Sequence, residues 1–315
     1  MSKMVLVLDE SGAKGCAKTR EKYDGEIGVM AGFLYTESEM RSTETYLNRV
    51  LRRHKKESGE KFHITDLDNH SQAKLRDEIF GYIKRANFRW FYQAVYAEGF
   101  HQSEFVESRG GNEDGKKSLH VTLFQHMFIQ GLCMAASIGI KKLSLEVKTD
   151  HVDKGILKRF EQVAEATSDL FQRRGREFFQ HVPADEPGKF EKQYYVISTE
   201  CDAVPQFEEI KFNIACEYST LTIMADILAN SVHHYLDEAQ KATPRVFLNN
   251  KEVLKEHPVA HLALAPYNEN HISPLLDIIY RRIKGEILVL PPTTGNGNGS
   301  AEESVATPSE KKISL

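Results

Sequence analysis

The feature that most constrains the fold is a short apolar run that ends in two acids near the N-terminus. Residues 5–8 read VLVL, so both faces of an extended segment would be apolar there. A strand of this kind lies inside a sheet that is covered on both sides. Asp9 and Glu10 end the run, and Ser11 and Gly12 follow as turn residues. We therefore predict a central, doubly covered strand with an acidic carboxyl end.

Strand-like and helix-like segments alternate along most of the chain. Residues rich in β-branched and aromatic side chains, or alternating in polarity, predict further strands over 27–36, 88–97, 142–149 and 193–199. Apolar stripes of helical period predict helices over 38–56, 71–86, 119–138, 152–172, 214–239 and 272–284. Ser38 and Ser71 are the expected N-caps of the first two helices, and residues 60–67 between these helices read as extended. With no helix between them, the first two strands are expected to be antiparallel neighbours.

This order of elements predicts an α/β fold with a mixed sheet flanked by helices. No compositional boundary divides the ordered part, so we expect one domain over residues 1–290 with inserted loops and helices. Residues 291–315 have no periodicity and almost no large apolar side chains, which is typical of a disordered tail.

Composition excludes several classes of protein. The formal net charge of the 315 residues is −4, so a strongly basic nucleic-acid-binding domain is excluded, and a polyanion would need a local basic patch or metal ions. No apolar run approaches the roughly 18 residues of a membrane span, and the early acids do not fit a signal peptide. The four cysteines are far apart without a C-x-x-C motif, which favours free thiols and a cytoplasmic location.

Four acidic residues occupy positions where a carboxylate could bind a metal ion or take part in catalysis. Asp9 and Asp150 each follow a predicted strand, Glu60 lies in the break between a helix and an extended segment, and Asp226 lies inside an apolar helix. Each has an ordinary alternative, because aspartates often cap turns and helical acids often face water. Carboxylates that converge would repel one another, and a divalent cation removes that cost. Ligands that are all oxygen favour Mg²⁺ or Mn²⁺.

The helix that holds Asp226 can be tested further by its spacing. An advance of 100° per residue places four polar residues in one stripe: Asp226, Asn230, His233 and Asp237. A surface helix would show the same stripe. Ala225, Ala229 and Ile223 flank it, however, and small neighbours allow a helix to approach a sheet closely. This favours a carboxylate at a buried edge.

Three segments resemble the bacterial family known as domain of unknown function 3800. They are DESG at residues 9–12, the glycine-containing strand GVMAGFLYT at 28–36, and MADILANSV at 224–232. GEKFHITDL at 59–67 resembles the Glu-x-x-His element of that family, here Glu60 and His63. Asp150 falls where the family has an acid that ends a central strand. The resemblance spans roughly residues 5–235 and rests on short motifs.

The resemblance implies an RNase-H-like fold with a metal-dependent nuclease centre. Its site residues carry over as Asp9, Glu60, His63, Asp150 and Asp226. The four carboxylates would hold Mg²⁺ or Mn²⁺, and His63 would orient water, contact the phosphate or assist the leaving group. Glu146 and Asp153, which lie near Asp150, are alternatives to it as ligands. Glu10 would lie on the opposite strand face from Asp9 and so have a structural role.

The leading hypothesis is hydrolysis of phosphodiester bonds in DNA or RNA. A second hypothesis keeps the fold without the chemistry, as a binding or regulatory subunit of a defence or mobile-element assembly that contacts a protein partner through residues 201–218. A third is a phosphatase or nucleotide hydrolase, although no P-loop motif is present. The basic cluster of Arg52, Arg53, Lys55 and Lys56 could steer a nucleic-acid backbone or form a solvated helix end.

Overall fold

The computed structural model describes residues 1–14, 21–54, 62–101, 115–172, 175–183, 190–198 and 205–264. Within these residues, five strands form one mixed sheet in the order β3-β2-β1-β4-β7. They are β1 (Ser2–Gly12), β2 (Ile27–Thr36), β3 (Phe91–Tyr96), β4 (Lys142–Thr149) and β7 (Glu209–Cys216). Strands β1, β2 and β3 are antiparallel neighbours, whereas β4 and β7 run parallel to β1. The predicted α/β class, the mixed sheet and the antiparallel first pair are confirmed.

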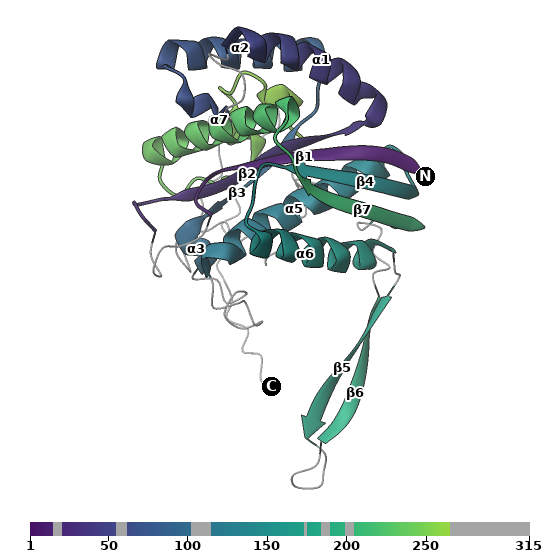
Figure 1. Ribbon diagram of the computed structural model, residues 1–315. Helices are drawn as coiled ribbons and strands as arrows, with labels where there is room; N and C mark the ends of the chain where they lie inside the picture. Colours follow the sequence, from purple (N-terminus) through teal and green to yellow (C-terminus); the bar gives the residue numbers. More distant parts are fainter. Residues whose placement is uncertain are drawn as a thin grey trace, which may run out of the picture.

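Helices cover both faces of this sheet (Figure 1). On one side lie α1 (Glu37–His54), α2 (Asn69–Arg85) and α7 (Thr220–Ala242). On the other lie α5 (Gly115–Ser137) and α6 (Lys154–Gln172), and a short helix, α3 (Ala97–His101), follows β3. Helix α7 packs directly on β1 and β2. The sheet therefore has two apolar cores, one on each face.

Strand β1 contributes alternately to these two cores, as its apolar run predicts. Val5 and Val7 lie in the core beneath α1, α2 and α7. Leu6 and Leu8 lie in the core beneath α5 and α6. The pairing of β1 with β2 continues through Gly12, so the alternation also continues. Asp9 therefore faces α7, and Glu10 faces α5.

A second, two-stranded sheet is formed by β5 (Gly175–Pro183) and β6 (Phe190–Ser198). Among the described strands these two pair only with each other, and Figure 1 shows the hairpin extending away from the main sheet. The described residues before and after the hairpin meet at its base. The backbone N–H of Phe207 donates to the carbonyl of Phe171 at 2.8 Å, and the N–H of Ile210 donates to Oε1 of Gln172 at 2.7 Å.

The predicted helix over residues 214–239 is wrong at its start. Residues 209–216 form β7, the edge strand of the sheet, and α7 begins only at Thr220. The physical reason is a period of two: Ile210, Phe212 and Ile214 all face the α6 side of the sheet. Residues 209–216 of the expected contact segment 201–218 thus form a strand of the sheet itself, and residues 201–204 lie outside the described part of the chain. Strand β5 was not predicted, whereas β6 overlaps the predicted strand at 193–199.

The expected caps are also corrected. Helix α1 begins at Glu37, so Ser38 lies inside it. Helix α2 is capped by Asp68, whose carboxylate accepts the N–H of Ser71 at 3.0 Å, so Ser71 lies in the first turn. Between these helices, the segment expected to be extended contains a 3₁₀ turn, η1 (Ile64–Asp66). Two further 3₁₀ turns, η2 (Lys251–Leu254) and η3 (Ala260–Leu262), follow α7.

Glu60, the expected helix over 272–284 and the expected tail over 291–315 lie outside the described residues. None of the helices in the described ranges has both the length and the apolar composition needed to cross a bilayer.

Candidate functional site

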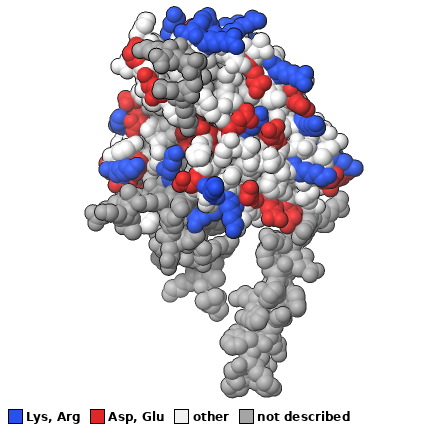
Figure 2. All heavy atoms as spheres, in the orientation of Figure 1, with Lys and Arg blue, Asp and Glu red and all other residues white. Residues whose placement is uncertain are grey.

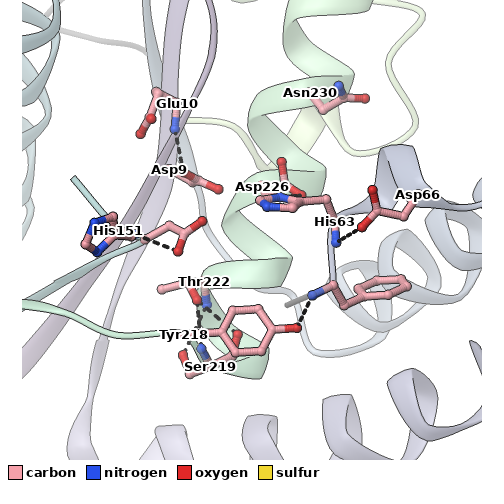
Figure 3. A network of polar contacts seen from close by, with 12 residues as sticks. Asp9, Glu10, His63, Asp66, His151, Tyr218, Ser219, Thr222, Asp226 and Asn230 are labelled. Carbon is pink, nitrogen blue, oxygen red and sulfur yellow. Dashed lines mark hydrogen bonds and ion pairs between the residues drawn. The ribbon is translucent and has the colours of Figure 1, made fainter. Parts of the chain in front are cut away.

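Asp9 lies at the carboxyl end of the central strand and is almost completely buried, with 6% of its surface exposed. Figure 3 shows its side chain pointing from β1 toward α7 and Asp226. Burial raises the pKa of Asp9 well above its ordinary value, and the charges of Glu10, Asp226 and Asp150 raise it further. The N–H of Glu10, which donates to Oδ1 of Asp9 at 2.9 Å, opposes this rise. Asp9 is thus a desolvated carboxyl group with other acids as neighbours.

Asp226 reaches this place because α7 lies close to the sheet. Ala225 and Ala229 are fully buried, and every residue from Leu221 to Val232 outside the polar stripe is buried as well. The surface-helix alternative is therefore wrong, and the expected approach of α7 to the sheet is confirmed. Ser219 caps the helix about two turns before Asp226, accepting the N–H of Thr222 at 3.3 Å. Burial raises the pKa of Asp226; His63 and the Ile64 amide oppose that rise.

His63 lies beside Asp226, with 4.0 Å between its Nδ1 and Oδ2 of the aspartate. Two hydrogen bonds hold the backbone in this position. The N–H of His63 donates to Oδ2 of Asp66 at 2.9 Å, and the N–H of Phe62 donates to the hydroxyl of Tyr218 at 2.6 Å. The imidazole is 42% exposed, so it contacts both the aspartate and solvent. The structure therefore brings the histidine of the Glu-x-x-His element to the acid on α7.

Asp150 follows β4, the parallel neighbour of β1. The register pairs Leu8 with Thr149, so Asp9, which lies within β1 rather than after it as predicted, is next to Asp150, the residue that follows β4. The charge of Asp150 raises the pKa of both Asp9 and Asp226, which places the three acids within electrostatic reach of one another. The N–H of His151 donates to Oδ1 of Asp150 at 2.6 Å.

The competing acids lie elsewhere. Glu146 pairs with Lys148, with 3.8 Å between Nζ and Oε1. Asp153 is exposed just before α6. Glu10 faces α5, as expected from the strand, where its Oε2 lies 3.5 Å from Nε2 of His120. Burial alone would raise the pKa of Glu10, but His120 and the ammonium group of Lys14 hold it below its ordinary range.

The donor set fits a hard divalent cation. Asp9, Asp150 and Asp226 offer only oxygen, and Oδ2 of Asp226 is buried without a hydrogen-bond donor. The negative charges of these acids repel one another, which raises the pKa of Asp9 and Asp226, and a bound cation would remove that repulsion. Within the described residues, no three His, Cys, Asp or Glu side chains are close enough to form a ready-made metal site. Glu60, the fourth expected ligand, lies outside the described residues.

Two cations beside the acids were not identified from the sequence. Arg76 on α2 donates from Nη2 to Oδ1 of Asn230 at 2.8 Å. Lys14 pairs with Glu10, and the charges of Asp9 and Asp150 contribute to raising its pKa. The polar stripe of α7 included Asn230, but nothing in the sequence shows which face of α2 meets that stripe. The position of Arg76 is a result of tertiary packing.

Surface charge is unevenly distributed despite the net negative charge. Figure 2 shows Lys and Arg gathered over α1 and α2 at the top of the view. Exposed members of this basic surface include Arg52, Arg53, Lys74 and Lys84. Arg53 is paired with Glu78 at 2.6 Å. The structure thus provides the local basic patch that an overall acidic chain needs to approach a polyanion.

Comparison of the chain with models of protein families and with curated proteins found no match.

Proposed function

We propose that this chain is a metal-dependent nuclease that hydrolyses phosphodiester bonds of DNA or RNA. The observation that carries the proposal is the buried carboxyl group of Asp9, whose pKa is raised by burial and by the acids Asp226 and Asp150, which come from two other elements. A cationic ligand would remove the electrostatic cost of bringing these carboxyl groups, distant in sequence, together.

The fold supports the RNase-H-like part of this proposal. An antiparallel meander of β1, β2 and β3 is extended on the other side of β1 by parallel strands, with helices on both faces. This is the arrangement expected of an RNase-H-like sheet. The acids at the carboxyl ends of β1 and β4 then meet α7 at one edge of the sheet, where ligands bind in open α/β sheets. The resemblance to domain of unknown function 3800 remains part of the proposal.

Asp9, Asp150 and Asp226 would hold Mg²⁺ or Mn²⁺, with Glu60 as the fourth proposed ligand. The chemistry that such an ion supplies when bound is activation of water and neutralisation of charge on the phosphodiester. The protein contributes a rigid strand and a capped helix that keep the carboxylates in place. Burial of Asp9 also excludes bulk water from one side of the group.

His63 is the proposed proton-carrying group. Its Nδ1 lies 4.0 Å from Oδ2 of Asp226, and its ring reaches solvent. A histidine in this position can orient a water molecule or hold a proton for the leaving oxygen.

The direct test is cleavage of labelled single-stranded and duplex oligonucleotides by purified protein with Mg²⁺ or Mn²⁺. We expect cleavage by the wild type and a loss of at least about 100-fold in rate for Asp9→Asn and Asp226→Asn. His63→Gln should lower the rate by about 100-fold while retaining ion binding. Glu146→Gln is the matched control, because this acid pairs with Lys148 and should leave the rate unchanged.

Calorimetry with Mn²⁺ separates the metal from the reaction. The wild type should bind the ion, and Asp9→Asn should bind it more weakly. A folded wild type that binds no divalent ion would refute the metal site. Ion binding without cleavage of any nucleic acid, but with turnover of a small phosphoester, would favour the phosphatase alternative.

A non-catalytic subunit is the second candidate, and one observation favours it. Strand β7 forms an edge of the sheet, and an edge strand leaves backbone groups available for pairing with another chain. This position gives the segment 201–218 a physical route to a protein partner. Retention of partner binding by Asp9→Asn, together with absence of cleavage by the wild type, would support it.

A further inference from the structure

Arg76 lies beside the carboxylate group and is fixed there by two side chains. Its Nη2 donates to Oδ1 of Asn230 at 2.8 Å and to Oε1 of Gln72 at 3.2 Å. Asn230 is one helical turn after Asp226, and Figure 3 shows both residues on α7. These two hydrogen bonds therefore fix the guanidinium group at the edge of the acidic site, whereas an unbonded surface arginine would be free to move.

The charge of Arg76 is poorly compensated. Among the described residues, no carboxylate lies at ion-pair distance from its guanidinium group, although Asp226 is close enough to stabilise its charge. Burial lowers the pKa of Arg76, and Nε is buried without a hydrogen-bond partner. A half-buried cation without a paired anion is costly. Its neighbours Asn230 and Gln72 supply neutral acceptors only, so the unmet requirement is for an anion.

We propose that Arg76 binds a phosphate group of a nucleic-acid backbone and thereby orients the strand across Asp226 and Asp9. This inference rests on the proposed function and names the first phosphate contact of that site. Guanidinium groups bind phosphate oxygens through two parallel N–H donors, which fixes both position and direction. Arg76 belongs to α2, and the basic surface over α1 and α2 (Figure 2) would give the backbone a path.

The test is binding, measured without catalysis. Fluorescence anisotropy is recorded with three labelled 20-nucleotide probes, single-stranded DNA, single-stranded RNA and duplex DNA, in EDTA at several salt concentrations. Arg76→Gln should weaken binding of the preferred probe by about tenfold. It should also reduce the slope of log affinity against log salt by about one, because one phosphate contact is lost.

Lys211→Gln is the matched control. It removes the same charge from an exposed residue in the amino-terminal half of β7, where Lys211 pairs with Glu209 at 2.9 Å. Its affinity and salt slope should equal those of the wild type. Arg76→Lys keeps the charge but loses the planar pair of donors, so an intermediate affinity is expected. Thermal melting of each variant verifies folding, and Arg76→Lys serves as the test variant if Arg76→Gln does not fold.

The outcomes for Arg76 and for the nuclease are separable. Equal binding by the Arg76 variants and Lys211→Gln overturns the phosphate contact, as does absence of binding to all three probes by the wild type. If the wild type cleaves and Arg76→Gln binds normally, the nuclease proposal is supported and the phosphate contact of Arg76 is refuted. If binding depends on Arg76 but the wild type cleaves no probe, the phosphate contact is supported and the nuclease proposal is refuted.

Discussion

Asp9 is the residue at which stability and proposed function oppose each other most directly. Its carboxyl group has lost most of its water and faces other acids, so the ionised form is disfavoured in the protein without a ligand. An arrangement of this kind destabilises the folded state unless a cation is present. Removing the charge should therefore help the fold while removing the proposed activity.

Asp9→Asn should raise the free energy of unfolding in EDTA by about 1 kcal/mol, because the amide has nearly the same shape without the buried charge. Addition of Mn²⁺ should stabilise the wild type, by about 2.7 kcal/mol at a concentration 100 times the dissociation constant, and should stabilise the variant less at the same concentration. Urea unfolding with and without the ion measures both effects. A less stable Asp9→Asn protein, or equal responses to Mn²⁺, would contradict this account.

His257 is a buried histidine with a structural environment. Its Nε2 lies 2.9 Å from the hydroxyl of Ser231, and its Nδ1 accepts the N–H of Val259 at 3.3 Å. The Ser231 hydroxyl donates to the carbonyl of Leu228, so the neutral histidine protonated at Nε2 satisfies every partner. Burial lowers the pKa of His257 to about 4. The fold thus selects the uncharged imidazole.

This lowered pKa predicts that stability decreases in acid. The stabilisation from neutral His257 is complete above the unfolded pKa of about 6.5 and is lost as the pH falls to about 4, amounting to about 3 kcal/mol. His126, whose pKa burial also lowers to about 4, adds to the same loss. Urea unfolding between pH 4 and 7 measures the dependence. His257→Gln should be less stable at pH 7 and should show a shallower decrease; parallel curves for the two proteins would exclude His257 as a cause.

At the scale of elements, the position of α7 determines the geometry of the site. Ala225 and Ala229 let the helix lie on β1 and β2, and Asp226 projects from the edge of that contact. On β2, a Cβ atom at Gly32 would lie 2.0 Å from the carbonyl oxygen of Val7, so only glycine fits this close approach of the strands. The small residues of α7 therefore set how closely Asp226 approaches the sheet, whereas Gly32 sets the spacing of β1 and β2.

Ala225→Leu should destabilise the protein by about 1–3 kcal/mol, because the larger side chain has no space between α7 and the sheet. It should also lower the cleavage rate by more than the loss of folded protein accounts for, because a displaced α7 would move Asp226 away from β1. Chemical denaturation and initial cleavage rates measure the two effects. Ala239→Leu, on a partly exposed position of the same helix, should change neither. Full cleavage activity of Ala225→Leu at a temperature where the variant is folded would show that cleavage does not depend on the position of α7.

The elements with strong patterns could be predicted from the sequence, and β2 and β4 have the expected bounds. Residues 209–216 were assigned partly to a helix because the helical pattern of α7 was extended backwards over Ile214. The alternation of Ile210, Phe212 and Ile214 was the available signal for β7. Among the candidate residues, the relation of Asp9 to Asp226 was predictable from motifs. The contact of Arg76 with Asn230 was not, because it depends on how α2 lies against α7.

At the scale of the whole molecule, acids and bases are separated in a way that net charge conceals. The acids meet at one edge of a doubly covered sheet, whereas exposed lysines and arginines gather over α1 and α2 (Figure 2). Under the proposed function, the chain would approach a polyanion through this basic surface and hold a cation at the acids. The β5–β6 hairpin takes no part in this arrangement, because β5 and β6 pair only with each other among the described strands.

The hairpin should accordingly be removable without loss of the fold. Phe171 and Phe207 are joined by a backbone hydrogen bond of 2.8 Å, so a short Gly-Ser linker in place of residues 174–205 can connect α6 to β7. Shortening a connection changes closure entropy by only about 0.6 kcal/mol for each twofold change in length, and a linker of about four residues is about three such steps, so the free energy of unfolding should change by no more than about 2 kcal/mol. Urea unfolding and cleavage rates of the shortened protein measure the effect, with normal Mn²⁺ binding expected. A large loss of stability or of cooperative unfolding would mean that the hairpin contributes to the core, and a selective loss of cleavage would assign it a role in binding the substrate.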